Sequence, residues 1–324
     1  TSSAKDQNYI SNSQGPVYGS FLDYTNNVQF NYPVDARKDS NGNIFVSDQG
    51  NHAIRKVTPA GVVNTFAGGG LGYIDSSTPS AARFSDLWQT AYDSAGNMYV
   101  ADGVNAAIRK ITTAGVVTTL AGGKLYDTTK LSAKFSYPQN VAYGSVSGTD
   151  YVFVADTDNH CIRRINTSTG DVTILTGRSE AGFVDGDAAT ALFKNPTGIV
   201  FVSAGVFGTD EFLVVCDSGN HSIRAINARY GNVTTIAGFS GNAGLYTGLA
   251  STTNFNNPTG IAIDSTQNYL YIADTNNNYI IRLNILSGVV TFIAGSRIGQ
   301  SGYAEDRKST RLNSSHVSES RMPS

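Results

Sequence analysis

One tripeptide that ends in aspartate recurs five times along the chain, and this repeat constrains the fold more than any other feature. Successive aspartates are 54, 54, 61 and 57 residues apart: Asp48, Asp102, Asp156, Asp217 and Asp274. Each unit holds four short segments rich in β-branched and aromatic residues, separated by Gly, Asn, Asp and Pro, without helical periodicity. Four strands repeated at this interval predict an all-β fold, a β-propeller in which each unit is one blade.

The residues after each aspartate carry a resemblance to a known family. "DQGNHAIRKV" (48–57), "DTDNHCIRRI" (156–165) and "DSGNHSIRAI" (217–226) resemble the Asn-His core of NHL repeats, and "PTGIAID" (258–264) and "VTTLAGG" (117–123) recur in register. The resemblance extends from about residue 9 to residue 305. It implies a propeller with six blades in the full protein, of which five are recognisable here and the sixth is truncated. The motif departs from the pattern at Ala106, Asn278 and Ile281.

We expect the propeller to occupy residues 1–305. Because "FIAGSRIGQSGYAED" (292–306) resembles "YISNSQGPVYGSFLD" (9–23), residues 9–12 are predicted to be a strand that closes the ring in the last blade. The tail 306–324, "DRKSTRLNSSHVSESRMPS", resembles a translated sequencing adapter, and we expect it to be non-native and unpaired. Without the four basic and two acidic residues of this tail, 19 basic and 23 acidic residues remain.

The repeated polar motif is predicted to be structural, because a set present in nearly every blade belongs to the frame. An Asp followed by Asn three residues later suits a capped turn, and a buried Arg needs a carboxylate partner. Each Asp that has an Arg in its repeat is therefore expected to pair with one. The structural set is Asp48, Asn51, His52, Arg55, Asp102, Asn105, Arg109, Asp156, Asn159, His160, Arg163, Asp217, Asn220, His221, Arg224, Asp274 and Asn277.

The upper mouth of the central tunnel is the predicted ligand site. Strand order sends the "DQGN" turns and the long linkers to one face, which we call the upper face, and loops of this kind carry function. Residues at the start of each first strand differ between blades and include the only Trp. The predicted ligand-binding residues are Asp35, Trp88, Gln89, Gln139, Asn140, Thr197 and Thr259. A protein or a glycan is the expected ligand of a non-enzymatic, monomeric binding propeller.

Two other functions stay open. A metal-dependent hydrolase or lyase, similar to lactonases or amidating lyases with six blades, needs a divalent ion over the tunnel, and the sequence offers Asp35 and Asn140 there. RNA binding, known in some NHL proteins, requires a basic upper face that the charge balance does not favour. The binding interpretation needs no cofactor and no catalytic residue.

Other features bear on location. Two sequons, at Asn166 and Asn232, fall in the turns of the lower face and are candidate glycosylation sites, which favours an extracellular or cell-surface protein. Cys161 and Cys216 lack the spacing of a metal site and are expected to be buried free thiols. The apolar runs are too short to span a membrane.

Overall fold

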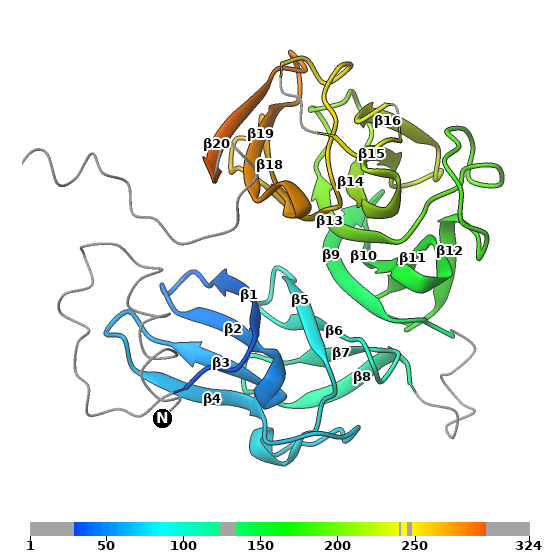
Figure 1. The fold of residues 1–324 in the computed structure, drawn as a ribbon. Coiled ribbons are helices and arrows are strands. Elements are labelled where there is room, and N and C mark those ends of the chain that lie inside the picture. Colours follow the sequence, from blue (N-terminus) through cyan, green and yellow to red (C-terminus); the bar gives the residue numbers. More distant parts are fainter. Residues whose placement is uncertain (1–28, 124–133, 240, 245–247, 296–324) are drawn as a thin grey trace, which may run out of the picture.

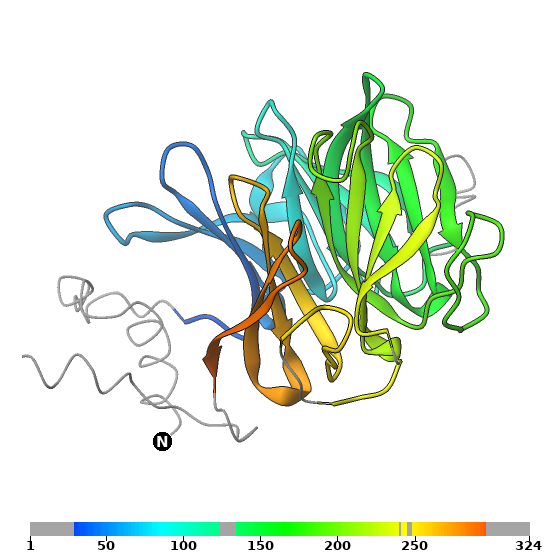
Figure 2. The ribbon, with the colours of Figure 1, turned by 90° about the horizontal axis from the view of Figure 1, so that it is seen from above.

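The computed structural model describes residues 29–123, 134–239, 241–244 and 248–295, which form five antiparallel sheets of four strands each. The sheets stand around a common centre as the blades of a propeller (Figure 1). Figure 2, turned by 90°, shows the blades from the side, with their strands running through the thickness of the propeller. The predicted all-β propeller is therefore confirmed.

The strands of each blade follow one another in chain order, with the first strand nearest the centre. Blade one contains β1 (Pro33–Lys38), β2 (Ile44–Asp48), β3 (Ala53–Val57) and β4 (Val63–Gly68). Blade two contains β5 (Leu87–Tyr92), β6 (Met98–Asp102), β7 (Ala107–Ile111) and β8 (Val117–Gly122). Blade three contains β9 (Pro138–Val146), β10 (Thr149–Asp156), β11 (Cys161–Asn166) and β12 (Val172–Gly177). Blade four contains β13 (Pro196–Val202), β14 (Phe212–Asp217), β15 (Ser222–Asn227) and β16 (Val233–Ala237). Blade five contains β17 (Pro258–Ile263), β18 (Tyr269–Asp274), β19 (Tyr279–Asn284) and β20 (Val290–Gly295).

Short helices accompany the sheets on the upper face. Single 3-10 turns follow the motif aspartate in four blades, and one more lies in the linker before blade two. They are η2 (Gln49–Asn51), η3 (Pro79–Ala81), η4 (Thr157–Asn159), η5 (Ser218–Asn220) and η6 (Thr275–Asn277). Among the described residues, no helix is both long and apolar enough to cross a membrane.

Apolar packing between neighbouring blades holds the sheets together. Four hydrophobic clusters are present in the described residues, one between each pair of consecutive blades. The isoleucine six residues after the motif aspartate points to the following blade each time, and it is fully buried at Ile54, Ile108, Ile162 and Ile223. At the same position in blade five, Ile280 is 39% exposed. Burial at this position therefore depends on the next blade.

The arc has two ends, blade one and blade five. The first strands pack on one another in the order β1, β5, β9, β13 and β17, and Figure 1 shows blade one (blue) and blade five (orange) on either side of the opening. The exposed Ile280 fits the expectation of a further blade, which stays a prediction. The closing strand 9–12 and the tail 306–324 lie outside the described residues.

Candidate functional site at the upper mouth of the tunnel

The motif aspartates lie at the upper ends of the second strands and are fully buried. Each accepts a backbone N–H from the segment that enters the first strand of its own blade, at 2.7 to 2.8 Å; the donors are Asn31, Ser85, Ser136, Lys194 and Asn256. The Asn three residues later donates to the same carboxylate in all five blades. These bonds fix the loops that form the upper mouth.

The predicted ion pairs are present in blades one to four, each within its own blade. The shortest N···O distances are 3.4 Å for Arg55–Asp48, 2.8 Å for Arg109–Asp102, 2.6 Å for Arg163–Asp156 and 2.6 Å for Arg224–Asp217. Burial raises the pKa of Asp217 to about 6, although Arg224 opposes that rise. Blade five differs, as the sequence predicted, because Ile281 takes the place of the Arg; the structure packs Ile281 in the core.

Two of these arginines also anchor the linkers. The guanidinium carbon of Arg224 lies 5.0 Å from the ring centroids of both Phe183 and Phe193, and Asp185 of the linker pairs with it at 2.6 Å. Asp185 also accepts the N–H and O–H of Thr235 in the outermost strand. Arg109 is held in the same way by Tyr73, Phe84 and Asp75. Sequence analysis missed this, although "GYID" (72–75) and "GFVD" (182–185) recur in the linkers.

Two of the three motif histidines connect neighbouring blades. All adopt the left-handed conformation, with φ of 52° to 53°, and Ala106 and Asn278 adopt it at the equivalent positions. His160 Nδ1 accepts the backbone N–H of Asn195 at 3.1 Å, and His221 Nδ1 accepts that of Asn257 at 3.0 Å. The Nδ1 atoms of His160 and His221 therefore have a structural role. Within the described ranges, no group of three His, Cys, Asp or Glu side chains is placed to hold a metal ion.

Four predicted ligand residues of blades one to three lie at the starts of the first strands and are engaged by neighbouring side chains: Asp35, Trp88, Gln89 and Asn140. Asp35 accepts the N–H and O–H of Thr90 at 2.9 and 2.7 Å. The amide of Asn140 donates to Gln89 across the blade boundary. Trp88 donates to Asp86 at 3.0 Å and packs edge-on against Tyr137, with ring centroids 5.9 Å apart. Three of the predicted polar residues, Asp35, Gln89 and Asn140, therefore connect one blade to the next.

A cavity of about 480 Å³ opens between blades three, four and five on the upper face. Three of the seven predicted ligand residues line it, Gln139, Thr197 and Thr259. Asp35, Trp88, Gln89 and Asn140 do not line it, so the structure does not bring all seven into one cavity. The remaining lining residues, which sequence analysis missed, are Tyr137, Thr157, Asp158, Asn195, Ser218 and Asn257.

Two local features explain the missed residues. Tyr137, Asn195 and Asn257 directly precede a first strand and have left-handed φ angles of 51°, 48° and 54°. Few non-glycine residues adopt that conformation, and Asn is over-represented among them. A residue before proline also marks the boundary of a secondary-structure element. Thr157 and Ser218 follow the motif aspartate, and their hydroxyls donate to Pro196 O and Pro258 O of the next blade. The Asn-Pro pairs at 195–196 and 257–258 were the sequence signal that could have identified two of these residues.

The polar groups of this cavity are hydroxyls and amides, with Asp158 as its one carboxylate. Thr197 and Ser218 share a hydrogen bond of 2.6 Å, and the hydroxyls of Thr259 and Thr275 share another of 2.6 Å. Such groups both donate and accept, and their hydroxyl hydrogens rotate to suit a ligand. The cavity is suited to neutral polar recognition.

The cysteines are buried and free, as expected from the sequence. Burial raises the pKa of Cys161 to about 12, and burial raises the pKa of Cys216 as well. A thiol reacts as the thiolate, so neither cysteine is a competent nucleophile at neutral pH.

Comparisons with known proteins agree with this architecture. No protein-family model matches the chain. NHL repeat-containing protein 2 of Gallus gallus is 27% identical over 292 residues, covering 78% of this chain and 39% of that protein. The chain thus spans about two fifths of the length of this relative.

Solved structures show the same fold. An auxiliary nutrient binding protein from Bacteroides ovatus superimposes with a TM-score of 0.61 at 22% identity, covering 83% of this chain and 61% of that chain. A catalytically inactive virginiamycin B lyase from Staphylococcus aureus gives a TM-score of 0.52 at 17% identity, covering 80% and 69%. At these identities the likeness concerns the fold alone.

Proposed function

The chain is a β-propeller of the NHL-repeat type, and on that basis we propose that it is a non-enzymatic binding scaffold whose upper mouth binds a protein or a glycan. The observation that carries the proposal is the polar cavity of about 480 Å³ at the mouth. Blades four and five line it with the same residue types, Asn195 and Asn257 before the first strand and Thr197 and Thr259 after its proline, whereas blade three has Tyr137 and Gln139 at these positions. A polar cavity with one distinct wall, held on a rigid and periodic frame, is suited to recognising one specific partner.

The chemistry of the cavity favours binding over hydrolysis. Hydroxyls and amides form directional hydrogen bonds with polar ligands but neither activate water nor form strong nucleophiles. Asp35, the carboxylate that the hydrolase alternative requires, accepts two hydrogen bonds from Thr90 and pairs with Arg37 at 3.3 Å. The likeness to a lyase structure concerns the fold and adds no catalytic group. We therefore place binding first, and propose an extracellular or cell-surface location on the strength of the two sequons.

An aromatic pair adds an apolar surface beside the cavity. Trp88 and Tyr137 pack edge to face, and both donate hydrogen bonds to Asp86, which fixes their orientation. Rigid aromatic side chains with a polar tip are frequent anchors at binding surfaces, because little conformational entropy is lost when they engage a ligand. We propose that this pair forms one wall of the ligand site.

Binding to glycan and protein arrays tests the proposal. The double variant Gln139→Ala with Thr259→Val should weaken the strongest array ligand by about tenfold or more, because two hydrogen bonds are lost. The matched control is Thr169→Ala on the lower face, which should leave binding unchanged. Retained binding by the double variant would contradict a site at this mouth, as would a metal-dependent hydrolysis that Asp35→Asn abolishes.

A further inference from the structure

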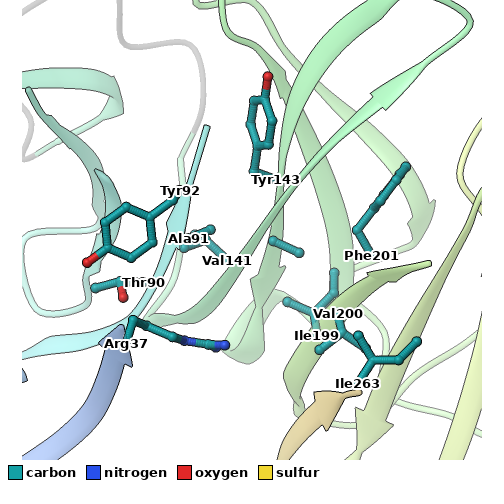
Figure 3. Close-up of a pocket in the computed structure, with 11 residues that line it drawn as sticks. Arg37, Thr90, Ala91, Tyr92, Val141, Tyr143, Ile199, Val200, Phe201 and Ile263 are labelled. Carbon is teal, nitrogen blue, oxygen red and sulfur yellow. The ribbon is translucent and has the colours of Figure 1, made fainter. Parts of the chain in front are cut away.

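A second cavity, of about 230 Å³, lies lower in the tunnel, and every first strand contributes to its wall. Most of the lining side chains are apolar, among them Ile199, Val200, Phe201 and Ile263. The polar side-chain atoms come from Arg37, Thr90, Tyr92 and Tyr143 (Figure 3). This cavity shares no lining residue with the one at the upper mouth.

Arg37 departs from the repeat. It stands four residues after the proline that begins β1, where blades two to five carry Ala91, Ala142, Val200 and Ala262. A small apolar residue suits a strand that faces a narrow tunnel, and a charged one there is costly unless it has a partner. In Figure 3 the guanidinium extends from β1 into the space between Tyr92 and Ile199. The single charge in this wall is therefore an exception to an apolar pattern.

Arg37 and Tyr92 bring hydrogen-bond donors to this cavity. Asp35 lies 3.3 Å from Arg37 Nε, yet that nitrogen is buried and has no hydrogen-bond partner among the described residues. The hydroxyl of Tyr92 is also buried and has none within the same part of the chain. Buried donors are usually hydrogen-bonded, so the Tyr92 hydroxyl lacks an acceptor that a ligand can supply. Thr90 donates to Asp35 Oδ2 and Arg37 Nε faces Asp35 Oδ1, so the two terminal nitrogens of Arg37 are left to extend into the cavity (Figure 3).

We propose that this cavity binds a small monocarboxylate with an apolar body. The carboxylate would accept the paired N–H groups of Arg37 and the hydroxyl of Tyr92, because the planar guanidinium fork matches a carboxylate. The apolar body would pack against Ile199, Phe201 and Ile263. A single arginine beside Asp35 gives too little positive charge for a phosphate dianion. The volume lies below the roughly 300–1,000 Å³ of pockets for drug-sized molecules, so the ligand is small.

Titration calorimetry with phenylacetate, and with phenylacetamide as its uncharged match, tests this site. Phenylacetate should bind the protein, and Arg37→Gln should weaken it by about tenfold or more, since hydrogen bonds to charged groups are among the strongest. Tyr92→Phe should weaken it by about threefold to tenfold, the worth of an ordinary hydrogen bond. The matched control Lys38→Gln removes the same charge from the neighbouring, exposed residue and should leave binding unchanged.

Several outcomes would overturn the proposal. They are equal affinity for phenylacetate and phenylacetamide, equal loss in Arg37→Gln and Lys38→Gln, or absence of binding for both phenylacetate and 4-phenylbutyrate. If Arg37→Gln lowers the Tm, Arg37→Lys is the second test, because it keeps the charge but lacks the planar guanidinium. It should weaken the binding of phenylacetate in part and leave the binding of phenylacetamide unchanged. The double variant Gln139→Ala with Thr259→Val should bind phenylacetate normally, which separates this site from the one at the upper mouth.

Discussion

Blade four and blade five have the same topology and similar motifs, but two adjacent motif positions distinguish them, the first by its burial and the second by its residue type. Blade four has Ile223 and Arg224, both fully buried; blade five has Ile280, which is 39% exposed, and Ile281, which is buried. The first difference comes from the neighbours, because Ile223 packs against blade five whereas Ile280 faces the open end of the arc. The second comes from the sequence itself.

The comparison shows how the motif tolerates the loss of its arginine. Burial raises the pKa of Asp274 to about 6, and hydrogen bonds from the Asn256 N–H and the Asn277 amide limit that rise. The linker also changes with the arginine, because "GFVD" (182–185) corresponds to "GLYT" (244–247) before blade five. The carboxylate partner is thus absent from the sequence where the arginine is absent. Arg and linker Asp act as a unit, and Ile281 replaces that unit with apolar packing.

Removing the arginine from blade four should have the largest effect. Arg224→Leu leaves Asp217 buried without its cation and Asp185 without its partner, which should lower the free energy of unfolding by about 3–5 kcal/mol. Urea unfolding followed by circular dichroism measures it. The control Arg282→Leu, a partly exposed arginine over Tyr269 in blade five, should cost below about 1 kcal/mol. Equal losses in the two variants would contradict a special role for the buried pair.

The next largest difference in stability between blades four and five should come from truncating the two isoleucines. Ile223→Ala opens a cavity between blades four and five and should lower the free energy of unfolding by about 2–4 kcal/mol. Ile280→Ala removes a partly exposed side chain and should cost below about 1 kcal/mol. The same urea titration compares them. In a longer chain that carries a sixth blade the two costs should converge, and a persistent difference there would contradict the predicted ring closure.

The pH dependence of stability should change when Asp274 is neutralised. Its pKa is about 6 in the folded protein against an ordinary value of 3.8, so the folded state holds this proton more tightly. The stability it contributes is complete below pH 3.8 and is lost as pH rises through about 6. Asp274→Asn should therefore flatten the stability profile across that window by about 2–3 kcal/mol. A thermal-melt series from pH 3.5 to 7, with identical profiles for the two proteins, would refute the raised pKa.

The smallest effect should come from the hydrogen bonds between blades. His221→Ala removes the acceptor of the Asn257 N–H and should cost about 1 kcal/mol, while the left-handed backbone is retained, as Ala106 retains it. His52→Ala is the matched control, because the buried His52 Nδ1 has no hydrogen-bond partner within the described residues. Differential scanning calorimetry should show a larger decrease in Tm for His221→Ala. A larger decrease for His52→Ala would contradict this role of the histidine.

Much of the frame was predictable because its signals are local and repeated. The Asp, Asn and Arg of the motif lie within eight consecutive residues, so the ion pairs of Arg55, Arg109, Arg163 and Arg224 followed from the need to neutralise a buried charge. The candidate ligand site was predicted only in part. Gln139, Thr197 and Thr259 line the upper cavity together with Tyr137, Asn195 and Asn257, whose left-handed φ a search for variable positions does not detect.

The sequence by itself determined the strands, the blade repeat and the buried polar motif, since alternation and turn residues act within a few positions of one another. Only the tertiary structure decided which residues share the upper cavity, because blades three, four and five meet there and bring together residues far apart in the chain, such as Gln139 and Thr259. It also decided that Asp35 is engaged by Thr90 and that Arg37 reaches the lower tunnel. Those outcomes depend on how the blades are placed around the axis, and that placement is set by packing between sheets.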